Sequence, residues 1–155
     1  MKVIVIMGSP SDREFVEQVT GALEALGLAW EARVASAHKT PRYLLDMLAA
    51  YESEEEPKVY ITVAGRSNAL SGMVDAAVTA PVIACPPYSG KFAGADIYSS
   101  LRAPSGVAPA VVPEPSNAAL LAAKMLGLAD EAVKDAVRQA QQVQRERLYG
   151  ADGGA

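Results

Sequence analysis

This chain of 155 residues contains only one cysteine and one histidine. A single cysteine excludes an internal disulfide. One cysteine and one histidine also provide too few sulfur and nitrogen ligands for a zinc or iron site, so we expect no metal. Without a second histidine to serve as its base, Cys85 cannot form a thiol-nucleophile triad. We therefore interpret Cys85 as a buried, inert side chain.

The chain also lacks an excess of positive charge and any long hydrophobic run. Its 14 Lys and Arg residues are outnumbered by 18 Asp and Glu residues, giving a net charge of −4, which argues against a nucleic-acid partner. The longest early apolar stretch, residues 3–7, is the length of a strand and too short to span a membrane. No layout typical of a secretory signal is present, so we expect a cytoplasmic protein.

What the sequence does contain is an alternation of strand-like and helix-like segments. β-Branched or apolar runs predict strands at 3–7, 30–34, 59–63, 82–85 and 110–112. Helical spacing of apolar residues predicts helices at 14–26, 41–51, 73–77, 96–101, 117–126 and 130–148, with Tyr43 on the buried side of the second. This order indicates a single α/β domain over residues 1–150, built on a doubly wound parallel sheet. Residues 151–155 are predicted to be a disordered tail.

Three loops rich in small residues follow the first three predicted strands, at 8–12, 35–40 and 64–69. In open α/β sheets, ligands bind beyond the carboxyl ends of the strands, at a switch in strand order. We therefore expect the three loops to converge on one rim and to form the functional site.

His38 lies in the second of these loops and is the main catalytic candidate. Imidazole is the side chain that most readily both accepts and donates a proton near neutral pH. It is surrounded by small residues and lies beside the cation Lys39. A helix is expected to start directly after it, with Thr40 as the cap and Pro41 at the first position. A site for proton chemistry on an anionic substrate has this composition.

The first loop carries Ser9, Ser11 and Asp12 directly before a helix. Its hydroxyls and backbone N–H groups suit a phosphate or sugar phosphate, although it is neither a P-loop nor a dinucleotide fingerprint. Asp12 could accept hydrogen bonds from ribose hydroxyls, or Ser11 or Asp12 could simply cap the helix.

The third loop contains a dense polar set that follows an apolar strand without interruption. A helix cap would need only one or two such residues, and four together favour a binding rim. The set comprises Gly65, Arg66, Ser67 and Asn68.

Taken together, these loops resemble the family of phosphoribosylaminoimidazole carboxylases and N(5)-carboxyaminoimidazole ribonucleotide mutases of purine biosynthesis. The resemblance covers nearly the whole chain. It rests on the motifs M-G-S-P-S-D (7–12), S-A-H-K-T (36–40), A-G-R-S-N-A-L-S-G (64–72), A-C-P-P (84–87), G-A-D-I-Y-S-S-L-R (94–102), P-S-G (104–106) and N-A-A-L-L-A-A (117–123).

The resemblance implies a flavodoxin-like three-layer α/β/α sandwich assembled as a homo-octamer, with a tetramer as the smaller alternative. The C-terminal helix would then pack in the oligomer. The implied reaction is reversible carboxylation of aminoimidazole ribonucleotide by CO2, with His38 as the proton carrier and no cofactor.

The resemblance also assigns substrate-binding roles around His38. Residues Ser9, Ser11, Ser36 and Lys39 would hold the phosphate and Asp12 the ribose. The remaining contacts would come from Ala37, Gly65, Arg66, Ser67 and Asn68.

The third loop distinguishes the two branches of the family. Mutases usually carry a glycine/alanine loop with a second histidine there, whereas this chain has Arg66-Ser67-Asn68 and Lys39 in place of the common arginine. The direct carboxylase, which needs no ATP-dependent partner, is therefore favoured over the mutase.

Two further alternatives concern the class of protein and the loop after the fourth strand. A non-catalytic flavodoxin-like nucleotide-binding domain is the more distant possibility. Gly90 and Gly94 would allow the loop at 86–94 to act as a lid.

Overall fold

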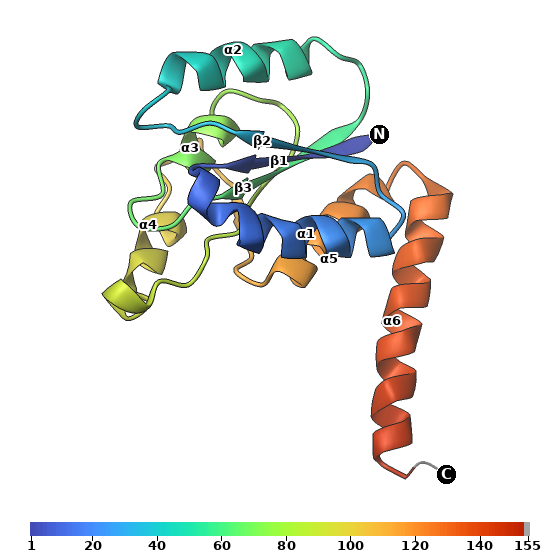
Figure 1. Cartoon of the computed structure of the whole chain (residues 1–155). Coiled ribbons are helices and arrows are strands. Elements are labelled where there is room, and N and C mark those ends of the chain that lie inside the picture. Colours follow the sequence, from blue (N-terminus) through green and yellow to red (C-terminus); the bar gives the residue numbers. More distant parts are fainter. Residues whose placement is uncertain (154–155) are drawn as a thin grey trace.

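The computed structural model describes residues 1–153 and places them around one parallel sheet (Figure 1). Its strands lie in the order β2-β1-β3-β4-β5, and every neighbouring pair is parallel. The bounds are β1 (Lys2–Met7), β2 (Trp30–Val34), β3 (Lys58–Val63), β4 (Val82–Ala84) and β5 (Ala110–Val111). This order is the flavodoxin-like one and confirms the predicted doubly wound sheet.

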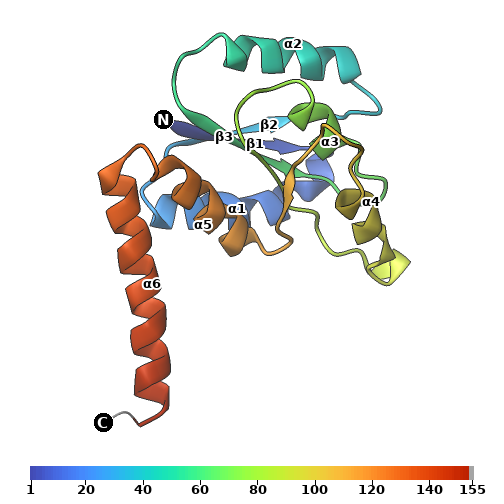
Figure 2. The same cartoon turned by 180° about the vertical axis from the view of Figure 1, so that it is seen from behind.

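Helices cover both faces of the sheet and complete the predicted three-layer sandwich (Figures 1 and 2). The helices are α1 (Arg13–Ala25), α2 (Pro41–Glu52), α3 (Leu70–Asp75), α4 (Tyr98–Leu101), α5 (Pro115–Leu126) and α6 (Glu131–Ala151). Three short 3₁₀ helices lie between them, η1 (Pro10–Asp12), η2 (Gly90–Phe92) and η3 (Ala95–Ile97).

Strand β1 shows why the sheet is buried on both sides. Its alternate residues Val3, Val5 and Met7 pack with α1 and α5. Ile4 and Ile6 point the other way and pack with α2 and α3. Because side chains alternate across a strand, a strand covered on both faces must be apolar throughout, which is why the run at 3–7 is unbroken.

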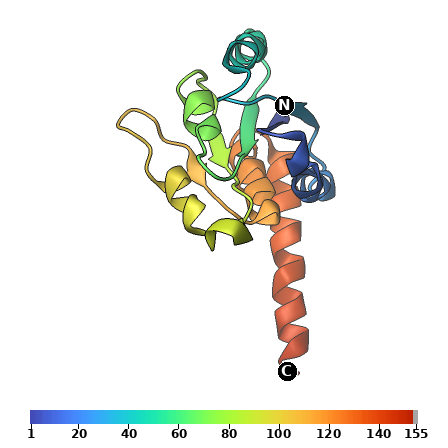
Figure 3. The same ribbon diagram turned by 60° about the vertical axis from the view of Figure 1, so that its left-hand side comes forward.

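Helix α6 leaves the three layers and projects away from the body of the molecule (Figure 3). Asp130 caps it, its carboxylate accepting a hydrogen bond from the N–H of Val133 at 3.0 Å. Val137 is buried against the α1–α5 side of the core, whereas Val143 is 59% exposed. The distal part of α6 therefore has no partner within the described part of this chain.

Charged side chains join the elements at the amino-terminal edge of the sheet. The ammonium group of Lys2 contacts the carboxylates of Glu31 and Glu54 at 2.8 and 2.9 Å. Tyr51 donates a hydrogen bond to Glu31 at 2.7 Å and accepts one from Arg33 at 2.9 Å. These contacts connect β1, β2 and α2 at the edge opposite the three small-residue loops.

The element limits follow the sequence predictions to within a few residues, with one misplaced side chain. Tyr43 was expected on the buried side of α2 but is 50% exposed. Its hydroxyl instead accepts a hydrogen bond from Arg33 at the outer strand β2, at 3.0 Å. At the C-terminus, α6 includes Ala151, and residues 154–155 of the expected tail lie outside the described residues.

Leu23 provides a test of this packing. It is fully buried between α1 and the sheet, so Leu23→Ala should lower the free energy of unfolding by about 2–5 kcal/mol. The matched control is Leu128→Ala, because Leu128 is 90% exposed and its truncation should change stability little. Urea unfolding measures the free energy of unfolding of both variants. An equal decrease in the two would contradict the burial of Leu23.

Candidate active site

A cavity of about 760 Å³ opens at the carboxyl edge of the sheet, a size that suits a small-molecule ligand. The loops after β1, β2, β3 and β4 all contribute to it, which confirms that the three small-residue loops converge. The lining residues are Gly8, Ser9, Ser11, Asp12, Ser36, Ala37, His38, Lys39, Ala64, Gly65, Arg66, Ser67, Ala69, Leu70, Pro87, Tyr88, Ser89, Gly90, Lys91 and Asp96.

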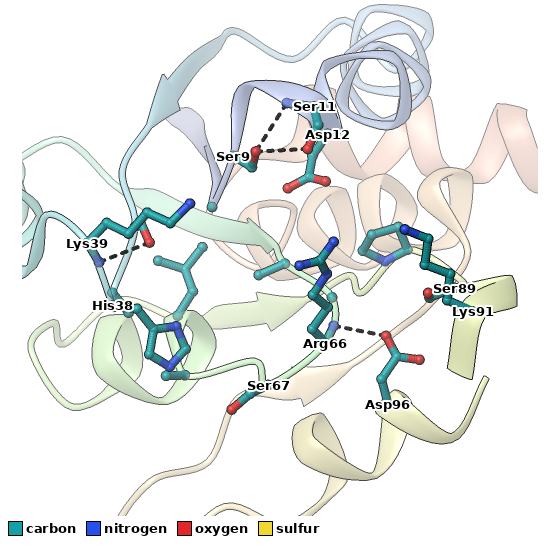
Figure 4. Close-up of a pocket in the computed structure, with 18 of the residues that line it drawn as sticks. Ser9, Ser11, Asp12, His38, Lys39, Arg66, Ser67, Ser89, Lys91 and Asp96 are labelled. Carbon is teal, nitrogen blue, oxygen red and sulfur yellow. Dashed lines mark hydrogen bonds between the residues drawn. The ribbon is translucent and has the colours of Figure 1, made fainter. Parts of the chain in front are cut away.

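His38 projects into this cavity from a closed turn (Figure 4). The Thr40 hydroxyl accepts a hydrogen bond from the N–H of Ser36 at 2.9 Å and lies 3.2 Å from the Ser36 carbonyl. The Ser36 hydroxyl in turn accepts from the N–H of Lys39 at 3.2 Å. These bonds fix the backbone on both sides of His38, and no side chain in residues 1–153 hydrogen-bonds its imidazole.

Thr40 was expected to cap α2, and this expectation is wrong in one respect. The residue occupies the N-cap position and Pro41 follows as the first helical residue, but the Thr40 side chain makes no capping hydrogen bond. Its hydroxyl is instead engaged by the backbone of Ser36. The residue that was predicted to cap the helix therefore closes the loop that carries His38.

Asp12 is directed into the cavity as well (Figure 4). Its side chain makes no capping hydrogen bond to α1, whereas Ser9 caps η1 by accepting from the N–H of Ser11 at 3.3 Å. Burial raises the pKa of Asp12 above its ordinary value, and a backbone hydrogen bond from Ser9 and the charge of Arg66 oppose that rise. The interpretation of Asp12 as a simple helix cap is therefore wrong.

The third loop brings Gly65, Arg66 and Ser67 into the cavity wall but not Asn68. Asn68 is only 8% exposed, and its amide group donates to the hydroxyls of Ser71 and Ser100 at 2.7 and 2.9 Å. Asn68 therefore stabilises the loop from its buried side and does not line the cavity. The prediction that it belongs to the binding rim is wrong.

A fourth loop, after β4, contributes residues that the sequence analysis did not assign to the site. They are Pro87, Tyr88, Ser89, Lys91 and Asp96. Strand β4 pairs with β3, so its carboxyl end lies at the same edge as those of β1 and β3. The same argument applied to the predicted strand at 82–85 would have identified them.

Fixed charges in the cavity favour an anionic ligand. Lys39, Arg66 and Lys91 carry positive side chains, whereas the acidic residues of the cavity are Asp12 and Asp96. No ion pair joins any two of these side chains in the described part of the chain. Lys39, Arg66 and Lys91 are therefore not held in direct ion pairs with the carboxylates of the cavity.

Cys85 lies just beyond β4 and is completely buried. Burial, and to a lesser extent the charge of Glu114, raises the pKa of its thiol to about 12. The thiol lies 3.6 Å from the carbonyl of Pro113, to which it donates. A neutral, inaccessible thiol confirms the prediction that Cys85 is inert.

Within residues 1–153, no group of three or more His, Cys, Asp or Glu side chains is arranged to hold a metal ion. No helix there combines the length and the apolar character that crossing a membrane requires.

Comparison with known proteins places this site in a family. Residues 2–147 match the family described as AIR carboxylase. The chain belongs to the AIR carboxylase family. A phosphoribosylaminoimidazole carboxylase from Archaeoglobus fulgidus is 52% identical over 98% of this chain and 83% of its own length. A protein of the same name from Treponema denticola is 49% identical, covering 97% and 94% respectively.

The fold agrees equally well with an experimental structure of the family. A crystal structure of Treponema denticola PurE superposes with a TM-score of 0.96 at 49% identity, covering 97% of this chain and 96% of that one. The family and the flavodoxin-like fold inferred from the sequence motifs are thus both confirmed.

Proposed function

We propose that this member of the AIR carboxylase family carboxylates 5-aminoimidazole ribonucleotide with CO2, giving 4-carboxy-5-aminoimidazole ribonucleotide without ATP. The observation that carries the proposal is one unpaired imidazole, His38, in a cation-rich cavity of a carboxylase-family chain. The relatives at 49% and 52% identity are named as carboxylases, which supports the same activity here.

His38 supplies the proton transfer that the reaction requires. The electron-rich ring carbon of the substrate attacks the carbon of CO2, forming a C–C bond and leaving that ring carbon with both a carboxylate and a proton. His38 removes the proton, the ring regains its aromaticity, and the imidazolium later releases the proton to solvent. In the decarboxylating direction His38 returns the proton to the ring carbon and CO2 leaves.

The other lining residues divide between the two ends of the substrate. Ser9, Ser11, Ser36 and Lys39 surround the phosphate, where hydroxyls, backbone N–H groups and one point charge are suitable donors. Asp12 accepts hydrogen bonds from the ribose hydroxyls.

The end of the cavity that binds the base has a different composition. Gly65, Ala37 and Ser67 allow a close approach of the base and CO2 to the backbone. At Gly65, an added Cβ would lie 3.4 Å from the Asp96 carboxylate, so a larger residue would narrow this part of the cavity.

Assembly and branch are part of the same proposal. We assign the chain to the direct carboxylase and not to the mutase because its single histidine leaves no second imidazole for a mutase-type loop.

We also propose a homo-octamer, with a tetramer as the alternative, in which the exposed Val143, Leu148 and Tyr149 of α6 contact another subunit. A role in purine synthesis suits a cytoplasmic location.

Two parallel ultraviolet assays test the activity. One supplies aminoimidazole ribonucleotide with CO2 and bicarbonate, and the other supplies the N-carboxylated isomer, corrected for its spontaneous breakdown. We expect carboxylation from CO2 alone, without ATP. Turnover only with the isomer would identify a mutase, and turnover in neither assay would favour a non-catalytic nucleotide-binding domain.

His38→Asn should fold normally and retain substrate binding but lose turnover by at least about 10²- to 10⁴-fold, because no other side chain replaces the base. Turnover measured at saturating substrate, together with binding by calorimetry, separates the two effects. An Asn variant with wild-type turnover would remove His38 from the mechanism.

Asp12→Ala should weaken substrate affinity by about 10- to 100-fold, the loss expected for hydrogen bonds to a charged group. Calorimetric titration measures this. Asp130→Ala is the matched control, because Asp130 caps α6 by its side chain and Asp12 caps nothing. The control should lose about 1 kcal/mol of stability with unchanged affinity.

The pH dependence of stability gives Asp12→Ala a second readout. The pKa of Asp12 is higher in the folded chain than in the unfolded one, so its contribution to stability is complete at low pH and is lost as the pH rises through the folded value. Asp12→Ala should therefore not lower the melting temperature at pH 7. A clear loss of stability with unchanged affinity would return Asp12 to a structural role.

A further inference from the structure

Arg66 has an unusual backbone conformation for its residue type. Its φ angle is +56°, and the only other non-glycine residue with a positive φ in residues 1–153 is Ala93. Side chains with a Cβ disfavour this left-handed region, so the surrounding structure must hold Arg66 there.

The residues that hold it come from the loop and helix after β4. The Asp96 carboxylate accepts a hydrogen bond from the N–H of Arg66 at 2.9 Å. The Ser99 hydroxyl contacts the Arg66 carbonyl at 2.7 Å and accepts from the N–H of Asn68 at 3.0 Å. Both backbone polar groups of Arg66 are therefore bound by residues about thirty positions away in the chain.

A buried network anchors the same loop to the sheet. Asn68 donates to Ser71 and Ser100, and the Ser71 hydroxyl pairs with that of Thr62 on β3 at 2.8 Å. The loop thus has one support in β3 and another in α4.

From this backbone the Arg66 side chain rises across the cavity toward the loop that carries Asp12 (Figure 4). Asp96 also lines the cavity, but the same oxygen that faces Gly65 accepts from Arg66. That oxygen is already engaged by the protein and acts on the loop and not on a ligand.

We propose that Asp96 and Ser99 are positioning residues for substrate binding, which hold Arg66 in its left-handed conformation so that its guanidinium faces Asp12 across the cavity. The inference rests on the proposed function only in taking Arg66 and Asp12 to be substrate-binding residues. It assigns a role to the motif at 94–102, which carries no part of the mechanism above.

A double-mutant cycle tests whether Asp96 acts through Arg66. Glycine adopts the left-handed conformation without support. Arg66→Gly therefore removes the guanidinium and also the need for the hydrogen bonds of Asp96 and Ser99 to the backbone of residue 66. Asp96→Ala alone should raise the KM for aminoimidazole ribonucleotide about tenfold, with kcat changed much less. Added to Arg66→Gly, the same substitution should raise KM less than about twofold.

Conservative and matched variants separate positioning from a general loss of structure. Asp96→Asn keeps an oxygen that can accept from the N–H of Arg66 and should restore most of the affinity. Asp75→Ala is the control, because the Asp75 carboxylate also accepts from a loop N–H, that of Ala108 at 2.7 Å, outside the cavity. It should leave KM unchanged. If Asp96→Ala does not fold, Ser99→Ala takes its place in the cycle.

A readout without substrate keeps this inference separate from the proposed function. Carbon NMR of aspartate-labelled protein follows the titration of Asp12, whose neighbours in the cavity include His38, Lys39 and Lys91. Loss of the Asp96 charge alone would lower the pKa of Asp12, whereas release of Arg66 would raise it. We expect an upward movement of the titration midpoint in Asp96→Ala, and only the downward movement caused by the lost Asp96 charge when Arg66 is already glycine.

Three results would overturn the proposal. They are an unchanged KM in Asp96→Ala, a further tenfold rise in KM when Asp96→Ala is added to Arg66→Gly, and a downward movement of the Asp12 midpoint in Asp96→Ala. The second would mean that Asp96 contacts the substrate directly. If wild-type protein does not turn over aminoimidazole ribonucleotide, the proposed function fails while the NMR measurement still decides the role of Asp96.

Discussion

The common direction of the five strands is the constraint on which the site depends. Because every strand runs parallel to its neighbours, the loops after β1, β2, β3 and β4 all emerge at one edge of the sheet. Residues separated by more than eighty positions, from Gly8 to Asp96, thereby line a single cavity. The opposite edge carries the charged contacts around Lys2 instead. Stability and chemistry are in this way assigned to different ends of the same strands.

Around the cavity, some side chains hold the backbone of the loops and others face the ligand space. The hydroxyls of Thr40 and Ser36 close the turn that carries His38, and Asp96 binds the backbone of Arg66. Since the protein's own hydrogen bonds fix these loops, little reorganisation is left for the ligand to induce, which is the usual requirement for efficient proton transfer and anion binding. Lys39, Arg66 and Lys91 form no ion pair within residues 1–153, so an anionic ligand need break none to reach them.

Much of this could be predicted from the sequence, for physical reasons that particular residues illustrate. The unbroken apolar run of β1 and the spacing of apolar residues in α1 are local patterns, and they identify buried elements without tertiary information. The meeting of three loops follows from strand direction alone. Asn68, Tyr43 and Thr40 were misplaced because their positions depend on hydrogen-bond partners outside their own segment. Asn68 donates to Ser100, and the hydroxyls of Tyr43 and Thr40 accept from Arg33 and from the N–H of Ser36. A polar residue type indicates that a hydrogen bond will form, but only the folded chain decides with which group.

The burial of Cys85 has a consequence for observing this protein. As the only thiol, protonated and enclosed beside the central strands, it can react with a reagent in solution only when that part of the sheet opens. The rate at which Cys85 is modified therefore reports the fraction of molecules in which this part of the sheet has opened, at any temperature or ligand concentration. Because Cys85 directly follows β4, it reports opening beside the fourth loop of the cavity.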